Sequence, residues 1–165
     1  MDRDFFITRR FEQLVLLLGS NMGDRKEFLE QATEQLAEAF GHVVLHSKIY
    51  ETEPWGNTEQ SKFLNQALVF ETNLRPIIVL ETILNIEQNL GRKRYEKWGP
   101  RVIDIDIIFY GQTIYQSDIL EIPHPYMHER LFVLEPLTEI IPNIVHPLFD
   151  KSVKQLKSKL NENEK

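Results

Sequence analysis

The sequence contains no cysteine, which excludes disulfide bonds and any metal site built on thiolates. It also has no long hydrophobic run. The longest uninterrupted aliphatic stretch, residues 14–18, is far shorter than the roughly 20 apolar residues that a bilayer-spanning helix requires. The first residues, Met-Asp-Arg-Asp-Phe-Phe, lack the basic and then apolar order of a secretory signal. We therefore expect a cytoplasmic protein that makes no contact with a membrane.

Positive charge is also scarce. The chain has 19 Lys and Arg residues against 25 Asp and Glu residues, a formal net charge of −6. A protein of this charge has no general attraction for nucleic acid or for an anionic membrane, so neither is expected as a partner. Any phosphate group must instead be bound by a local cluster of cationic side chains.

In other respects the composition is that of an ordinary globular protein. Hydrophobic residues make up 42% and charged residues 27% of the 165 residues, which argues against disorder and against a fibrous repeat. A chain of this length can bury the larger part of its surface as one unit. We expect a single domain over residues 1–165 that acts as a monomer.

The hydrophobic pattern predicts alternating strands and helices. Apolar or alternating runs bounded by turn residues predict strands, and apolar residues spaced three and four apart predict helices. The predicted strands are 14–18, 43–50, 63–72 and 102–110, and the predicted helices lie between Asp24 and Gly41, between Pro76 and Gly91, at 127–137 and at 152–160. Residues 51–61 and 92–101 are predicted as long loops. The order strand, helix, strand, strand, helix, strand is that of an α+β ferredoxin-like fold, a split βαβ sandwich with helices packed on an antiparallel sheet.

Two carboxylates share one face of the last predicted strand. Residues two apart on a strand point the same way, so Asp104 and Asp106 face one side and the isoleucines around them face the other. Two unpaired carboxylates repel each other, and a divalent cation removes that conflict; magnesium is commonly held by one or two carboxylates with water and substrate phosphates. Taken alone, the pair is better explained as the polar outer face of an edge strand.

The loop before this strand changes that interpretation. Its cationic residues are Arg92, Lys93, Arg94, Lys97 and Arg101. A compact cationic patch beside two carboxylates predicts a polyphosphate site, because arginine forks match phosphate oxygens and stay charged while a metal neutralises the remaining oxygens. The alternative is a solvated charge run that pairs with Glu96, which fits the two lysines better than Arg92 and Arg101.

Several motifs accompany this site. The loop and the acidic strand read Gly91-Arg92-x-Arg94 and Trp98-Gly-Pro-Arg-x-x-Asp-x-Asp106. The others are Leu18-Gly-Ser-Asn21, Tyr50-x-Thr-x-Pro54, Phe63-Leu-Asn65 and Pro123-His-Pro-x-Met127-x-x-Arg130. Together they resemble the signature of the 6-hydroxymethyl-7,8-dihydropterin pyrophosphokinase family over about residues 14–147, although each alone is a weak signal. Residues 1–13 lie outside the resemblance.

The resemblance implies a reaction and a set of site residues. The hydroxymethyl oxygen of the reduced pterin would attack the β-phosphorus of ATP, and AMP would leave, as a step of folate biosynthesis. Asp104 and Asp106 would bind two magnesium ions, and Arg92 and Arg101 would stabilise charge on the transferring group. The ATP contacts would come from Arg92, Arg94, Trp98, Arg101, His124 and Arg130. The pterin contacts would come from Thr52, Trp55, Phe63, Asn65, Trp98 and Phe132.

By this resemblance Phe63 and Phe132 would sandwich the flat pterin ring, and Asn65, on the same strand face as Phe63, would hydrogen-bond its edge. The alternative is that both phenylalanines are core residues, as most are. His124 and His128 stand four apart, but Pro125 interrupts a helix and no third ligand follows, so we reject a zinc site.

Two other functions remain open from the residues alone. A nucleotidyltransferase would also use paired aspartates on a split βαβ fold. A regulatory module that binds a small ligand would explain the fold and the apolar pattern, but not two aspartates beside five cationic residues. The residues do not choose a general base: positioning and electrostatics alone, or one of the aspartates, would serve.

Overall fold

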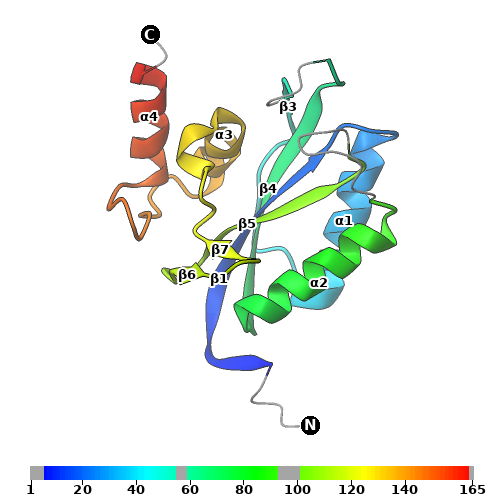
Figure 1. Cartoon of the computed structure of the whole chain (residues 1–165), viewed down its shortest axis with the longest axis horizontal. Coiled ribbons are helices and arrows are strands. Elements are labelled where there is room, and N and C mark those ends of the chain that lie inside the picture. Colours follow the sequence, from blue (N-terminus) through cyan, green and yellow to red (C-terminus); the bar gives the residue numbers. More distant parts are fainter. Residues whose placement is uncertain (1–5, 55–58, 93–100, 164–165) are drawn as a thin grey trace.

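The computed structural model describes residues 6–54, 59–92 and 101–163. Its elements are β1 (Ile7–Ser20), α1 (Arg25–Phe40), β2 (Leu45–His46), β3 (Tyr50–Thr52), β4 (Phe63–Leu74), α2 (Pro76–Asn89), β5 (Asp104–Tyr110), β6 (Tyr115–Gln116), β7 (Glu121–Ile122), the 3-10 turn Met127–Glu129, α3 (Leu131–Ile140) and α4 (Val153–Asn163) (Figure 1). Within these ranges no helix has the length and apolar character needed to cross a membrane.

The central sheet is antiparallel, with the strand order β2-β4-β1-β5 and with β3 also paired to β4. β1 lies inside the sheet, where Leu17 pairs with Ala67 of β4 on one side and with Asp106 of β5 on the other. β4 lies between β1 and β2, so the unit β1–α1–β2 is split by a later strand. The predicted α+β ferredoxin-like fold is confirmed.

Helices cover both faces of this sheet. α1 and α2 pack on one face, and α3 and α4 lie on the other (Figure 1). Leu14, Leu16 and Leu18 belong to the cluster with α1 and α2, whereas Val15 and Leu17 belong to the cluster with α3 and α4. A strand buried on both faces must be apolar throughout, which explains the aliphatic run in β1.

β1 is longer than its apolar part. It begins at Ile7, which pairs with Leu74 at the far end of β4, and the register shifts between Ile7 and Glu12. Phe11, in this first half, is 69% exposed. The prediction of a strand at 14–18 therefore found only the part that the core buries on both faces.

The predicted strand 43–50 is wrong as a single element, because the structure has two short strands separated at Ser47. The Ser47 hydroxyl accepts the N–H of Ala67 at 2.9 Å and donates to the Lys48 carbonyl at 2.6 Å. A side chain thus replaces part of the strand ladder. β3 then reaches Thr52, inside the predicted loop 51–61.

The helix predicted at 127–137 is also divided. The turn Met127–Glu129 and α3 are separated at Arg130, whose backbone is extended (φ −124°, ψ 107°). The hairpin of β6 and β7 was not predicted, because two-residue strands are too short to show a period.

Candidate active site

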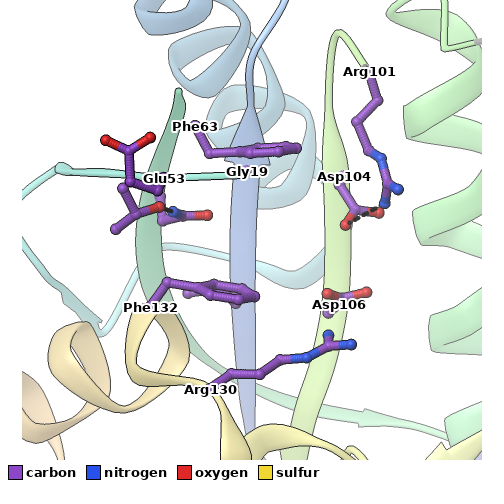
Figure 2. Close-up of a pocket in the computed structure, with 11 residues that line it drawn as sticks. Gly19, Glu53, Phe63, Arg101, Asp104, Asp106, Arg130 and Phe132 are labelled. Carbon is purple, nitrogen blue, oxygen red and sulfur yellow. Dashed lines mark hydrogen bonds and ion pairs between the residues drawn. The ribbon is translucent and has the colours of Figure 1, made fainter. Parts of the chain in front are cut away.

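A cavity of about 530 Å³, including its open mouth, lies on the sheet face that also carries α3 (Figure 2). β1, β4 and β5 form its floor, and β3 and the start of α3 contribute its sides. Its lining residues are Leu17, Gly19, Thr52, Glu53, Phe63, Asn65, Arg101, Asp104, Asp106, Arg130 and Phe132. One part of the cavity is aromatic and the other is charged.

The aromatic part is formed by two phenylalanines from distant parts of the chain. Phe63 begins β4 and Phe132 lies in the first turn of α3, and their rings face each other across the open space (Figure 2). Asn65 is 3% exposed, and its Nδ2 donates to the Thr52 hydroxyl at 2.5 Å. A flat ring that enters between the phenylalanines would meet the Asn65 amide at its edge.

Gly19 of β1 leaves room for this arrangement. A Cβ atom at this position would lie 3.0 Å from Asn65 Oδ1 and 3.5 Å from Phe63 Cδ1. The first distance is tighter than most real Cβ contacts, so any other residue would push the Asn65 amide. The absence of a side chain at Gly19 is therefore part of the shape of the cavity.

The charged part is built on β5. Asp104 and Asp106 both line the cavity, whereas Ile103, Ile105 and Ile107 are buried in the core on the opposite face. The strand thus has the alternation that the sequence predicted, because each successive side chain turns to the other face. Both carboxylates project into one space from a rigid element.

Asp104 is held by two of the predicted arginines. Arg92 Nη1 lies 2.9 Å from one carboxylate oxygen of Asp104, and Arg101 Nη1 lies 3.1 Å from the other. Arg92 follows the end of α2, while Arg101 lies three residues before Asp104 in the chain. Cationic groups therefore already flank the carboxylates at the place where a polyphosphate would need them.

Arg92 also forms an ion pair with Glu87, a residue that the sequence analysis missed. Its side chain is 4% exposed, and Oε2 accepts hydrogen bonds from Arg92 Nη1 and from the N–H of Ile105, the latter at 2.8 Å. Burial is the main cause that raises the pKa of Glu87 to about 7; the charge of Arg92 opposes this shift and that of Asp104 adds to it. The available signal was an acidic residue within the apolar stripe of α2, four residues after Ile83.

The second aspartate occupies an unfavourable electrostatic position. Burial raises the pKa of Asp106 well above its ordinary value, and the neighbouring charges of Asp104 and Glu87 raise it further. Arg130 and Arg101 act in the opposite direction. A cation bound between the two aspartates would relieve the same conflict, which is a feature of carboxylates that bind metals.

Arg130 and His124 lie on the α3 side of the charged part. Arg130 is 6% exposed, and its guanidinium carbon lies 5.1 Å from the ring centroid of Tyr126 and 5.7 Å from that of Phe132. The pKa of His124 is lowered to about 4, first by burial and then by Arg130. The Tyr126 N–H donates to His124 Nδ1 at 3.2 Å, so the neutral ring carries its proton on Nε2 and can donate from there.

Asn21 joins the segments on either side of the site. Its Nδ2 donates to Gln60 Oε1 at 2.8 Å and to the Ser61 carbonyl at 3.0 Å. Its Oδ1 accepts the N–H of Arg101 at 2.9 Å, and its own N–H donates to the Arg101 carbonyl at 3.2 Å. The end of β1 thereby fixes both the segment that leads into Phe63 and the segment that leads into Asp104.

Residues 15–142 match the family model described as 7,8-dihydro-6-hydroxymethylpterin-pyrophosphokinase (HPPK). The chain belongs to this pyrophosphokinase family. Three similar proteins are each named 2-amino-4-hydroxy-6-hydroxymethyldihydropteridine pyrophosphokinase. The Aquifex aeolicus protein is 42% identical over 140 residues, which cover 85% of this chain and 87% of the relative. The Methylorubrum extorquens protein is 48% identical over 129 residues (78% and 82%), and the Bacillus subtilis protein is 45% identical over 130 residues (78% of each chain).

Solved structures agree with this family assignment at the level of the fold. The crystal structure of wild-type Plasmodium falciparum HPPK-DHPS matches with a TM-score of 0.71 and 17% identity over 91% of this chain. The match covers 45% of the Plasmodium chain. The family that the motifs predicted is thus confirmed by sequence, and its fold by structure.

Most of the residues predicted for the pyrophosphokinase site come together in one cavity. Those that line it are Thr52, Phe63, Asn65, Arg101, Asp104, Asp106, Arg130 and Phe132. Arg92 joins them through Asp104, and His124 through Arg130. Trp55, Arg94 and Trp98 lie outside the described residues, as do Lys93 and Lys97. The sequence analysis missed Leu17, Gly19, Glu53 and Glu87; the roles of all these residues stay predictions.

Proposed function

We propose that this chain transfers the terminal pyrophosphoryl group of ATP to the hydroxymethyl group of 6-hydroxymethyl-7,8-dihydropterin, which gives AMP and the pterin diphosphate. The observation that supports it best is the division of one cavity into an aromatic part and a charged part. A flat heterocycle suits the first and a polyphosphate suits the second. The named relatives support the same reaction.

In this proposal the pterin ring lies between Phe63 and Phe132. Each aromatic contact contributes roughly 0.5–1.5 kcal/mol beyond the area that it buries, which is enough to orient a small polar ring. Asn65 would hydrogen-bond the ring edge, and the hydrogen bond from Asn65 to Thr52 would hold the amide in one orientation. Trp55 and Trp98 are proposed as further contacts from segments outside the described residues.

Asp104 and Asp106 would hold magnesium, and we propose two ions. The donor set fits: both groups are carboxylates on one strand face, and magnesium is usually bound by one or two carboxylates together with substrate phosphates and water. Magnesium would neutralise phosphate charge and bring phosphate oxygens close to two anionic side chains. The raised pKa of Asp106, caused by burial and by Asp104, supports a cation at this place.

The arginines would bind the phosphates and stabilise the charge that moves during transfer. Arg92 and Arg101 already lie beside Asp104. Arg130 lies near Asp106, as Figure 2 shows. Neutral His124 would donate a hydrogen bond rather than a charge, because its pKa is lowered to about 4. Arg94 is proposed as a further ATP contact outside the described residues.

The reaction forms a bond between the pterin hydroxyl oxygen and the β-phosphorus and breaks the bond from that phosphorus to the bridging oxygen of AMP. Catalysis then depends mainly on aligning the two substrates and on stabilising charge. The cavity supports this alignment, because its aromatic part and its charged part share the same strands. The residues that line the described cavity belong to a single chain, so we infer that a monomer is competent. We also propose that the protein acts in the cytoplasm, as the sequence predicts.

The decisive experiment is to incubate the protein with ATP, magnesium and the reduced pterin and to separate the products. The proposal requires AMP and pterin diphosphate without free pyrophosphate. Free pyrophosphate would indicate nucleotidyl transfer instead. No turnover of ATP with any pterin or divalent ion would contradict an enzymatic function. Gel filtration of the active fraction tests the monomer.

A further inference from the structure

Glu87 is a buried acid at an unfavourable position. It lies in the last turn of α2, where the C-terminal end of the helix dipole repels negative charge. Its side chain is 4% exposed, so it has also lost most of its hydration. Asp104 adds a second negative charge nearby. An acid at such a position requires compensating contacts, and the contacts of Glu87 indicate a role.

Two hydrogen bonds join Glu87 to Arg92. The Glu87 carbonyl accepts the N–H of Arg92 at 3.0 Å, and the Glu87 carboxylate accepts from Arg92 Nη1. The same Nη1 atom also donates to Asp104. Two carboxylates therefore orient the Arg92 guanidinium through one nitrogen atom. Asp104 lines the cavity, whereas Glu87 does not.

The second contact joins Glu87 to the strand of the two aspartates. β5 is the edge strand of the described sheet, and Ile105 pairs with Leu18 of β1. The Ile105 N–H donates at 2.8 Å to Glu87 Oε2. One oxygen atom of Glu87 thus accepts hydrogen bonds both from Arg92 and from the N–H of Ile105, the residue between Asp104 and Asp106.

We propose that Glu87 is a positioning residue for pyrophosphoryl transfer: its carboxylate orients the Arg92 guanidinium and holds the aspartate-bearing edge of β5 against α2. It touches no substrate and acts through Arg92 and β5. This inference rests on the proposed function, and it adds a residue that none of the sequence motifs included.

The test replaces Glu87 by glutamine. Glutamine keeps the size and an acceptor oxygen for the Ile105 N–H, but it removes the charge that attracts Arg92. We expect turnover to fall about tenfold or more, as is common when a supporting partner of a catalytic group is removed. The KM for the pterin and the thermal unfolding midpoint should change little, because the pterin part of the cavity and the packing are retained. Glu81→Gln is the matched control, since Glu81 is an exposed acid on the same helix, and it should behave as wild type.

A double-mutant cycle with Arg92→Ala separates positioning from a structural role. If Glu87 acts through Arg92, then Glu87→Gln should reduce turnover of the Arg92→Ala variant much less than it reduces that of wild type. Equal losses in both backgrounds would overturn the inference, and so would a lower unfolding midpoint with unchanged turnover. If Glu87→Gln does not fold, Glu87→Asp serves in the same cycle, because it keeps the charge and withdraws the oxygen from Arg92. Failure of wild type to form pterin diphosphate would refute the proposed function, whereas active wild type with equally active Glu87→Gln refutes only this inference.

Discussion

Replacing Phe63 by leucine should weaken pterin binding and leave the fold intact. Phe63 and Phe132 face each other across the cavity (Figure 2), and leucine keeps an apolar side chain, so the change mainly removes the stacking of one ring on the pterin. That stacking contributes roughly 0.5–1.5 kcal/mol. Because about 1.4 kcal/mol corresponds to tenfold in affinity, we expect the Kd for the pterin to rise roughly 2- to 12-fold.

The two phenylalanines should differ in their effect on the nucleotide. The Arg130 guanidinium lies 5.7 Å from the ring centroid of Phe132, so Phe132→Leu should also lower the affinity for an ATP analogue. Phe63→Leu should leave that affinity unchanged. If the rings lie on opposite faces of the pterin, the two losses should multiply, which gives roughly 5- to 150-fold for the double variant.

The assay is calorimetric titration of the pterin into each variant, with magnesium and a non-hydrolysable ATP analogue at saturation. Phe11→Leu is the matched control, because this phenylalanine is 69% exposed and lies in the first half of β1. It should bind as wild type does. Wild-type pterin affinity in Phe63→Leu, with an unchanged unfolding midpoint, would refute the stacking argument.

Three further predictions concern charge. Asp104→Asn and Asp106→Asn should each keep the fold and lower turnover roughly 100-fold or more, since each removes an anionic metal ligand; near-normal turnover of both at ordinary magnesium concentration would contradict the metal site. Arg101→Ala should lower turnover on the order of 100- to 1000-fold with little change in pterin affinity, and a loss seen mainly in pterin titrations would show that Arg101 is wrongly assigned. The pKa of His146 is lowered from 6.5 to about 4, first by burial and then by His128, so between these values the unfolded chain binds more protons than the folded one. The stability that His146 contributes is therefore complete above pH 6.5 and falls as the pH approaches 4. The thermal unfolding midpoint of wild type should fall over the same range, and that of a His146→Gln variant should fall less steeply. Identical profiles for the two proteins would contradict the lowered pKa of His146.

Features that depend on neighbours along the chain could be predicted from the sequence. The placing of Asp104 and Asp106 on one face of a strand follows from the two-residue period of any strand, and the structure has that alternation. The ends of α1 follow from local signals in the same way, since Asp24 accepts the N–H of Glu27 at 3.1 Å and Gly41 takes a φ of 94°. The family motifs also depend on spacing along the chain, and the family they predicted is the one that the comparisons show.

Features that depend on contacts between distant segments could be seen only in the folded structure. The break between β2 and β3 arises because the Ser47 hydroxyl binds the backbone of Ala67 in another strand, which no local pattern reveals. The face-to-face placing of Phe63 and Phe132 could be inferred only from the resemblance, because each residue alone resembles a core phenylalanine. Glu87 shows the same limit most clearly. Its burial comes from the packing of α2 against β5, and its raised pKa comes mainly from that burial and then from Asp104, against the opposing charge of Arg92. These interactions exist only after the chain has folded.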